Sequence, residues 1–322
     1  MTRAASARRA LLRWGAPLAA LVLVAGGVLL GKTTNAFGPG RVCHGWVTAA
    51  DAQRALGATG PLIGKDSVHG SCEVRLGGWG SGAGRALIVT PFDESSRFPF
   101  ELDLWRVSGS EALLTGSRTA GAVDAYGGWV LLPDSCREAV PRTDEDERPS
   151  LRAAVLDGHG DPAGIAGVLE SAARGLVERH GCAEPDAVTV GGPGSVSPAA
   201  ATDFGAVCGL DGFALPRPHG GPVVERVSGS RDGDAWFCDL AFSEQPRKGP
   251  FARFAIVRHP ALTAGLKDTD YTRARCGGRE TYFVWDDNMY WTPEKRADAG
   301  FPAAKDLSQA FETTARKALG CG

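Results

Sequence analysis

The sequence predicts an α+β protein made of two tandem α/β sandwich units, each an antiparallel sheet with a C-terminal helix, preceded by one N-terminal transmembrane or signal helix. Three observations predict this fold. Eight cysteines repeat their spacing, each half ends with an amphipathic helix that runs into Gly-Cys, and a charge-free apolar run lies near the N-terminus. At 322 residues, the chain is long enough for two domains.

The composition is that of a globular protein with an acidic body. Hydrophobic residues make up 43% of the chain and charged residues 22%. The formal net charge is −2, but residues 1–36 hold five basic side chains and no acid, so the remainder carries 30 basic and 37 acidic side chains. An acidic body argues against nucleic-acid binding, which needs a basic face for the phosphates.

Residues 1–36 have the pattern of a signal or anchor segment. Four arginines within residues 1–13 precede the uncharged run Trp14–Gly31. As a helix this run would extend about 27 Å, close to the roughly 30 Å of a bilayer core. The basic flank predicts that residues 32–322 face outside the cytoplasm. Two alternatives stay open: a single-pass anchor in the cell membrane, or a signal peptide that is cleaved near Ala36 and releases a secreted protein.

The cysteine spacing predicts a duplication. The first four cysteines are separated by 29, 64 and 46 residues and the last four by 30, 38 and 45, so the outer gaps agree and only the middle gap differs. One unit copied once, with an insertion in the first copy, produces this pattern. The cysteines are Cys43, Cys72, Cys136, Cys182, Cys208, Cys238, Cys276 and Cys321.

Local sequence supports the same duplication. The element Arg-x-x-Ile-Val follows the second cysteine of each unit, at Arg85–Val89 and Arg253–Val257, and is typical of a buried strand. Each unit then closes with an amphipathic helix, Pro162–His180 or Pro302–Leu319, that begins near proline and ends at Gly-Cys. The alternative is two unrelated domains with coincidental cysteines. A second echo, Arg-Val-Ser-Gly-Ser at 106–110 and 226–230, lies at different places relative to the cysteines and does not count toward the duplication.

An even number of cysteines outside the cytoplasm favours disulfides over metal sites, and no pair forms C-x-x-C. Equivalent bonds in each unit predict the pairs Cys43–Cys72, Cys136–Cys182, Cys208–Cys238 and Cys276–Cys321. Each would remove roughly 3–4 kcal/mol of unfolded-state entropy. The units then span 43–182 and 208–322, and residues 183–207, rich in Gly, Pro, Ser and Ala, form a linker.

Secondary structure is expected at these places. Thr48 to Asp51 resembles a capping box that opens a short helix ending at Gly57. The alternation in Phe100–Trp105 is typical of a sheet with one solvent-exposed face. Residues 282–291 have the pattern of strand, turn, strand. Other strands are predicted at 72–77, 85–91, 122–132, 151–157, 222–228, 235–242 and 253–258.

The segment Cys43-His-Gly-Trp-Val-Thr-Ala-Ala-Asp-Ala-Gln-Arg-Ala-Leu-Gly57, followed by Ser71-Cys72-Glu-Val-Arg, resembles a family of actinobacterial exported lipoproteins of unknown function. Members open with a cysteine, a short helix ending in Leu-Gly, and a second cysteine that starts a strand. The resemblance covers about 50 residues and implies a PsbP-like α/β/α sandwich. It supplies no catalytic residues.

One cluster is a candidate ligand-binding site. Carboxylates beside aromatic plates can bind sugars or cationic ligands. The alternative is a hairpin whose aromatic side chains pack into the sheet or under the helix. The cluster consists of Trp285, Asp286, Asp287, Tyr290 and Trp291.

The sequence contains no recognisable catalytic motif, no cofactor motif and no metal-ligand spacing among its six histidines. We therefore expect a non-enzymatic extracytoplasmic protein that the N-terminal helix attaches to the membrane and that binds a partner or ligand at the cell envelope, such as an envelope protein or a glycan. The alternatives are a secreted hydrolase whose site forms only in three dimensions, and a purely structural envelope component.

Overall fold

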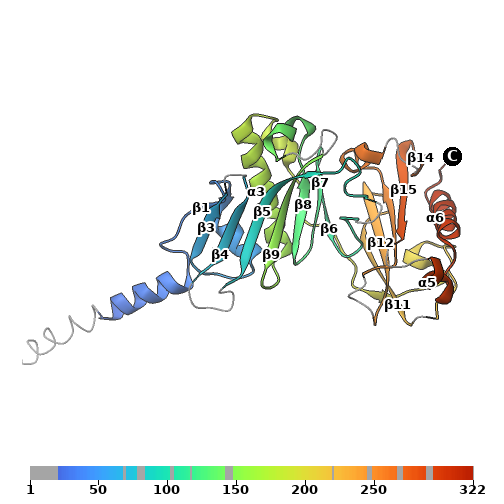
Figure 1. The fold of residues 1–322 in the computed structure, drawn as a ribbon, viewed down its shortest axis with the longest axis horizontal. Coiled ribbons are helices and arrows are strands. Elements are labelled where there is room, and N and C mark those ends of the chain that lie inside the picture. The colour runs from blue at the N-terminus through green and yellow to red at the C-terminus, as the bar shows by residue number, and fades with distance from the viewer. Residues whose placement is uncertain are drawn as a thin grey trace, which may run out of the picture.

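A computed structural model describes residues 21–67, 70–77, 84–101, 105–116, 118–141, 148–219, 221–244, 249–266, 271–287 and 293–321. It shows an α+β body with a helix over residues 21–33 projecting from one end (Figure 1). Apolar side chains of this helix, such as Leu23 and Val24, are exposed. Residues 14–20 of the apolar run lie outside the described ranges. Within those ranges, no helix is both long and apolar enough to cross a membrane, so the transmembrane helix stays a prediction.

The first sheet has seven antiparallel strands in the order β3-β4-β5-β9-β8-β7-β6. Helix α3 (Pro162–His180) packs across one face of this sheet, and α2 (Ala49–Ala55) lies against α3. A two-stranded ribbon, β1 (Arg41–Val42) and β2 (Val47–Thr48), leads into α2. The strands are β3 (Leu62–Asp66), β4 (Cys72–Leu76), β5 (Ala86–Glu94), β6 (Ala112–Thr115), β7 (Ala120–Val123), β8 (Gly127–Leu131) and β9 (Arg148–Leu156), with the 3-10 turns η1 (Asp134–Ala139) and η2 (Pro185–Val188).

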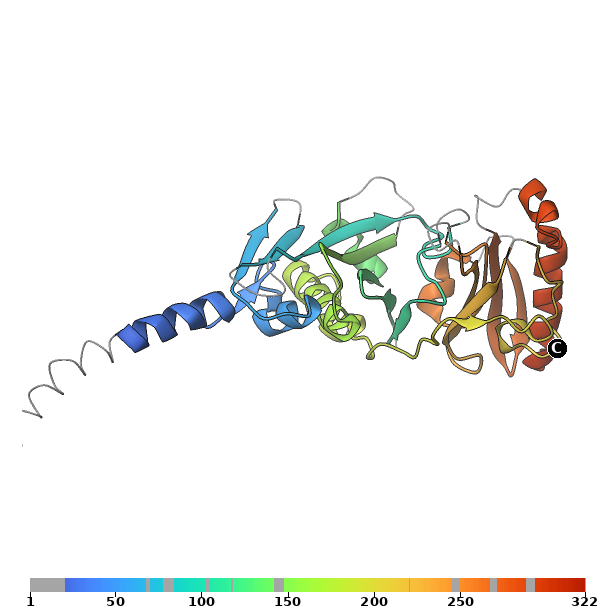
Figure 2. The same cartoon turned by 90° about the horizontal axis from the view of Figure 1, so that it is seen from below.

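The second sheet has six antiparallel strands in the order β10-β11-β12-β13-β15-β14. Helix α6 (Ala304–Ala318) packs against β14 and β15. Figure 2 shows α6 at the far end of the body, on the side of this sheet that faces away from the first sheet. The strands are β10 (Ala200–Ala201), β11 (Val223–Gly229), β12 (Ala235–Phe242), β13 (Ala252–Val257), β14 (Thr272–Cys276) and β15 (Arg279–Asp287), with η3 (Val207–Gly209), α4 (Pro260–Thr263), η5 (Ala264–Leu266) and α5 (Pro293–Asp298).

The two sheets share a five-strand order. In the first sheet it is β3-β4-β5-β9-β8, and in the second it is β11-β12-β13-β15-β14. In both, the chain makes three strands side by side, crosses to the far edge and returns as the fourth, and a helix follows. In the first unit β6 and β7 come between β5 and β8 in the chain, and in the sheet they extend the edge beyond β8. These extra strands lie in the segment where the middle cysteine gap of the first unit is longer.

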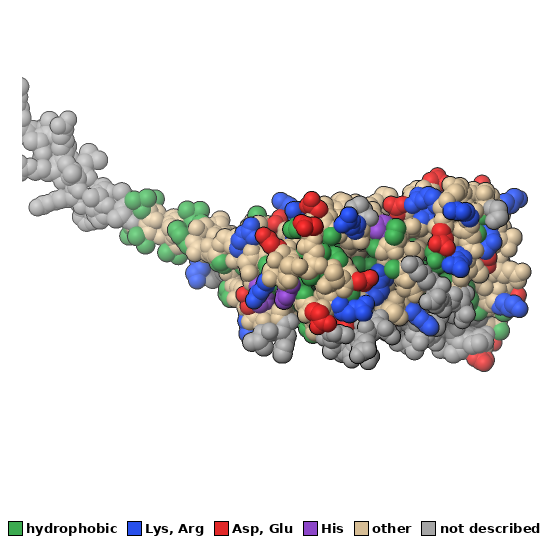
Figure 3. Space-filling view, turned by 90° about the horizontal axis from the view of Figure 1, so that it is seen from above, with side chains coloured by type: hydrophobic (Ala, Val, Ile, Leu, Met, Phe, Trp, Pro, Cys, Tyr) green, Lys and Arg blue, Asp and Glu red, His purple; other side chains and the backbone are tan. Residues whose placement is uncertain are grey.

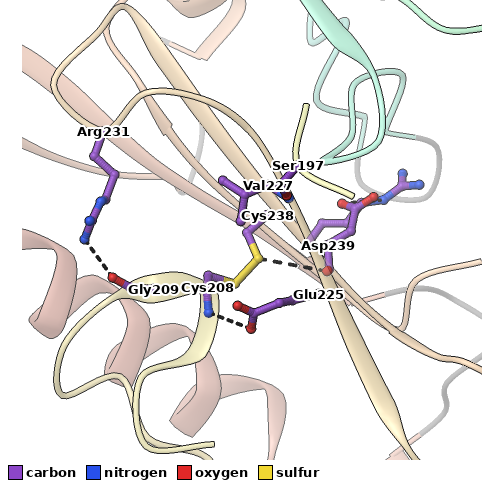
Figure 4. The surroundings of a disulfide bond; sticks show 9 residues. Ser197, Cys208, Gly209, Glu225, Val227, Arg231, Cys238 and Asp239 are labelled. Carbon is purple, nitrogen blue, oxygen red and sulfur yellow. Dashed lines mark hydrogen bonds and ion pairs between the residues drawn. A yellow bond between two sulfur atoms is a disulfide. The ribbon is translucent and has the colours of Figure 1, made fainter. Parts of the chain in front are cut away.

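The disulfides are the four pairs that the repeated spacing predicts: Cys43–Cys72, Cys136–Cys182, Cys208–Cys238 and Cys276–Cys321. No described cysteine is free. In each unit one disulfide joins the first cysteine to a strand, which is β4 in the first unit and β12 in the second (Figure 4 shows the Cys208–Cys238 bond). The other disulfide joins the end of the terminal helix to η1 in the first unit and to β14 in the second. Four disulfides are typical of a protein that folds in an oxidising compartment outside the cytoplasm.

Local signals set the helix ends. Thr48 is the N-cap of α2, and its hydroxyl accepts a hydrogen bond from the Asp51 amide at 3.1 Å, as the capping box predicts. Asp161 caps α3 in the same way, with the Gly164 amide at 3.0 Å. Gly181 ends α3 in the left-handed conformation, with a φ of 60°.

Three hydrophobic clusters divide the body into four layers. Alternate side chains of each sheet point to opposite faces. In β8, Val130 packs toward α3 while Trp129 packs toward the second sheet, and in β12, Trp236 packs toward α6 while Phe237 packs toward the first sheet. The layer order is therefore helix, sheet, sheet, helix. The cluster between the two sheets, here called the inter-sheet core, joins the units into one body.

Polar contacts cross the inter-sheet core in both directions: Arg148 of the first unit donates to the Ala261 carbonyl, and four side chains of the second unit donate the other way. Side chains of the second unit donate hydrogen bonds to backbone carbonyls of residues 100–116 in the first unit. His259 shows the pattern: its Nδ1 accepts from the Ala261 amide, so its Nε2 carries the proton and donates to the Gly116 carbonyl at 2.7 Å. The other donors are Arg253 to Trp105 at 3.0 Å, Tyr271 to Phe100 at 2.7 Å, and Ser228 to Ser108 at 3.2 Å.

The two Arg-Val-Ser-Gly-Ser segments lie against each other in this interface. The Ser228 hydroxyl bonds to the Ser108 carbonyl, and a Cβ added to Gly109 would lie 2.2 Å from the Arg226 carbonyl oxygen. The sequence echo thus marks a contact, although the two copies occupy different positions in their units. Only glycine allows the backbones to approach this closely.

Residues 183–207 are packed rather than flexible. Val188 and Val190 are buried in the first core, and Gly191 and Gly194 donate backbone hydrogen bonds to carbonyls of β6. Further along, β10 pairs with β11. This segment therefore covers an edge of each sheet, because its Gly- and Pro-rich composition allows close approach to the strands as well as flexibility.

Two strand expectations change. Phe98, Phe100 and Trp105 belong to the inter-sheet core and are not part of a described strand, because their aromatic rings fill the space between the sheets. The predicted strand at 122–132 is instead β7, a turn, and β8, since Asp124 accepts hydrogen bonds from the amides of Tyr126 and Gly127 and reverses the chain. Residues 102–104 of the expected alternation and residues 288–292 of the expected strand, turn, strand pattern lie outside the described residues.

Two carboxyl groups lie in the inter-sheet interface. Burial, together with the nearby charges of Asp124 and Asp239, raises the pKa of Glu111 to about 8, while Arg253 opposes the rise. Burial also raises the pKa of Asp239, although Arg253 Nε lies 3.6 Å from its Oδ1 and Ser108 and Gly109 hydrogen-bond to it. The interface thus favours the protonated form of Glu111.

Replacing Cys276 and Cys321 together with serine should lower the free energy of unfolding by roughly 3–4 kcal/mol, because the unfolded chain regains the entropy of an open loop. Urea unfolding followed by circular dichroism measures this loss. Ser308→Ala, a surface change on α6, is the control. An unchanged midpoint in the double variant would contradict the stabilising role of this bond.

Gly109→Ala should loosen the inter-sheet interface, because the added methyl group meets the Arg226 carbonyl oxygen. Calorimetry should show a lower melting temperature or two separated transitions, one for each unit. Gly192→Ala is a matched control, since its Cβ would meet nothing within 4 Å. Equal melting curves for the two variants would refute the tight contact.

Glu111 should make stability depend on pH. Its pKa rises from an ordinary 4.5 to about 8 in the folded protein, so between these values the folded state holds a proton that the unfolded state releases. Stability should fall as the pH rises through this window. Urea titrations at pH 5 and pH 8 measure the loss of unfolding free energy between these two values. Glu111→Gln should make this loss smaller, whereas Glu184→Gln, an exposed control, should leave it unchanged. Parallel pH profiles for the wild type and the Glu111 variant would exclude this role.

Candidate functional site

Two adjoining hollows lie on the first unit, between the β1–β2 turn and α3. Their volumes are about 550 Å³ and about 420 Å³, within the usual range for small-molecule sites. His44, Trp46 and Arg179 line both hollows, which together are called the Trp46 groove. The first hollow is otherwise lined mainly by Arg41, Thr48, Ser171, Arg174 and Glu178. The second is lined mainly by Glu138, Val140, Pro141, Leu176 and His180.

The β1–β2 turn sets one wall of the groove. Cys43, His44 and Gly45 all have left-handed backbones, with φ of 54°, 55° and 82°. Such values are costly for cysteine and histidine and persist only where other contacts hold them. Here the disulfide to Cys72 fixes one residue, and the carboxylate of Asp66 accepts the His44 amide at 3.1 Å.

The second unit repeats this turn without the groove residues. Cys208 also has a left-handed backbone, with a φ of 58°. Its amide donates to the carboxylate of Glu225 on β11 at 3.0 Å (Figure 4), and β11 has the same place in the second sheet as β3, which carries Asp66, in the first. Burial raises the pKa of Glu225. The residues after Cys208 are Gly209 and Leu210, so no histidine or tryptophan follows.

Trp46 rests directly on α3. A Cβ at Gly175 would lie 2.3 Å from Cδ1 of the indole, so glycine is required here for the ring to reach the helix. One turn further along α3, the guanidinium of Arg179 lies 6.0 Å from the centre of the Trp46 ring. The imidazole of His44 lies 4.8 Å from the same ring. These three side chains form the ridge between the hollows.

The groove has an excess of positive charge. The Nε2 atom of His44 is buried and has no hydrogen-bond partner among the described residues, while its Nδ1 lies 3.7 Å from Asp66. Arg41 donates to the Gly45 carbonyl at 2.8 Å. Within the described ranges, Arg179 has no carboxylate within 4 Å. Figure 3 shows basic, histidine and acidic side chains together near the end of the body where the N-terminal helix departs.

Arg174 is shared between two acids outside the groove. Its nitrogens lie 3.6 Å from Glu170 and 3.7 Å from Asp186, and the Asp186 side chain is almost fully exposed. Exposed ion pairs of this length are weak. The guanidinium is therefore held near the first hollow and can exchange these partners for an anionic ligand.

The structure separates two members of the cluster that the sequence predicts. Trp285 and Asp286 are neighbours on β15 and point to opposite faces: Trp285 packs against the second core, whereas Asp286 is buried on the inter-sheet side. Burial raises the pKa of Tyr271 to about 12, and the charge of Asp286 contributes to this rise while Arg97 opposes it. Strand alternation thus separates the aromatic plate from this carboxylate. Asp287 ends β15, and Tyr290 and Trp291 lie outside the described residues.

Sequence reasoning missed the Trp46 groove. His44 is one of six scattered histidines and Trp46 stands only within the Cys43-His-Gly-Trp motif. A signal existed, because Gly175 and Arg179 are one helical turn apart and so share a face of α3. Nothing in the sequence, however, indicates that this face meets a turn more than 120 residues earlier.

Among the residues that the structure describes, no group of three or more His, Cys, Asp or Glu side chains could hold a metal ion. In comparisons with known proteins, no family model, curated protein or solved structure matches this chain. The candidate site is therefore defined by its geometry alone.

Proposed function

We propose that this chain is a non-catalytic extracytoplasmic binding protein, tethered by its N-terminal helix or secreted after cleavage, and that the Trp46 groove takes its ligand. One observation carries the proposal: Trp46, seated on α3 at Gly175, separates two adjoining hollows that Arg179 also lines, and among the described residues no carboxylate lies within 4 Å of Arg179. An unneutralised cation beside a fixed aromatic ring favours an anionic ligand with an apolar part.

The composition of the groove supports binding over hydrolysis. In the described part of the chain, no hydrogen bond joins a serine or cysteine to a histidine, the pairing that activates a nucleophile. Glu111, whose pKa burial raises to about 8, lies in the inter-sheet interface and not in the groove. Recognition needs only the fixed indole, the cations and the hydroxyls that line the hollows.

We also propose that the two units are copies of one sandwich. The shared five-strand order, the matching disulfides and the left-handed first cysteine support this origin. The copies have diverged in role. The first kept or gained the groove, and the second presents the side chains that hold residues 100–116.

Trp46→Ala should abolish retention of a natural ligand, whereas Trp285→Ala, a half-buried tryptophan in the second unit, should not. The full chain is purified from its envelope in mild detergent, and co-purifying small molecules and lipids are identified by mass spectrometry. A molecule present with the wild type and with the Trp285 variant but missing with the Trp46 variant supports the groove. Loss with the Trp285 variant alone would point back to the site predicted from the sequence.

A further inference from the structure

Resting on the proposed function, we infer that the Trp46 groove binds a phosphate ester that carries an apolar substituent. The phosphate would lie in the first hollow, against Arg179 and Arg174 and beside the ring of His44. The apolar part would lie in the second hollow, on the other side of Trp46. A lipid headgroup and a soluble phosphate ester share this chemistry.

The first hollow offers donors of the kind that phosphate needs. Arg174 and Arg179 lie one and two turns along α3 from Ser171, whose hydroxyl is a further donor. Guanidinium groups bind phosphate through paired hydrogen bonds that are stronger than neutral ones. Glu178 is an acid among these lining residues, and the cations outnumber it.

The second hollow differs in chemistry. Val140, Pro141 and Leu176 give it apolar walls, and Glu138 and His180 lie among the polar residues that line it. Trp46 separates this hollow from the basic one and contributes to both. A ligand that spans the groove therefore needs a charged end and an apolar end, about as far apart as the two sides of an indole ring.

The position of the groove agrees with a ligand at the membrane. The groove lies in the part of the body next to the N-terminal helix, and Arg41 of its first hollow follows that helix closely in sequence (Figures 1 and 3). If the N-terminal segment enters the bilayer, the groove comes near the phosphate layer of the lipids, where basic side chains are attracted to anionic headgroups.

Arg179→Gln tests the inference against a matched control. Arg179 is exposed in the last turn of α3, and Lys317 is exposed in the last turn of α6, so Lys317→Gln removes the same charge from the corresponding helix of the other unit. The full chain in neutral detergent is titrated with inorganic phosphate and with glycerol phosphate by calorimetry. We expect the Arg179 variant to bind phosphate at least about tenfold more weakly than the wild type, and the Lys317 variant to bind it with wild-type affinity. Gly175→Ala displaces Trp46, which borders the apolar hollow. It should therefore weaken the binding of a phosphate ester with an acyl chain more than the binding of inorganic phosphate.

Two vesicle compositions separate the sources of phosphate. The ligand is a lipid headgroup if the soluble esters bind and phosphatidylglycerol vesicles retain the wild type more strongly than the Arg179 variant. This difference between the two proteins must be larger than their difference on phosphatidylcholine vesicles. If the esters bind but the vesicles do not distinguish the variants, the ligand is soluble. Equal phosphate affinity in the wild type and both charge variants would overturn the inference. A ligand without phosphate that depends on Trp46 would also overturn it, while leaving the proposed binding function intact.

Discussion

The burial of apolar side chains between the two sheets is the constraint on which the rest of the structure depends. A helix covers one face of each sheet. The opposite face would expose aromatic residues such as Phe237 and Trp129 to water if the units were separate. Because the sheets cover each other, both faces of each are protected from water over the contact area. The extra strands β6 and β7 enlarge the first sheet where this contact is made, which gives the longer middle cysteine gap a structural purpose.

Disulfides act on a different part of the molecule. They lie on the helix-covered sides, where they fix the first cysteine and the terminal helix of each unit, whereas the inter-sheet core contains no cysteine. The covalent links therefore hold each unit and the hydrophobic contact holds the pair. In the first unit the Cys43 link has a second consequence, because the left-handed turn that it fixes carries His44 and leads directly to Trp46. A structural bond thus positions the candidate ligand site.

Much of the local structure could be predicted from the sequence because local forces decide it. The bounds of α3 and β12 agree with the pattern of apolar residues and with Asp161 and Gly181 at the helix ends. The disulfide pairs follow from repeated spacing. Strands β3, β6 and β14 could not be predicted in this way, since all three are short strands at the edges of their sheets. Each becomes a strand by pairing with the next strand in the chain, β4, β7 or β15, which the rest of the sheet holds in place.

The sequence by itself determined the composition class, the repeated cysteine framework, the terminal helices and the apolar segment near the N-terminus, because each depends on spacing or on neighbouring residues. Only the tertiary structure decided which faces meet. It placed Trp285 and Asp286 on opposite sides of one sheet, packed residues 183–207 along two strand edges, and brought Gly175 under Trp46. The physical reason is that contacts between distant residues arise from the packing of whole layers, which no local pattern encodes.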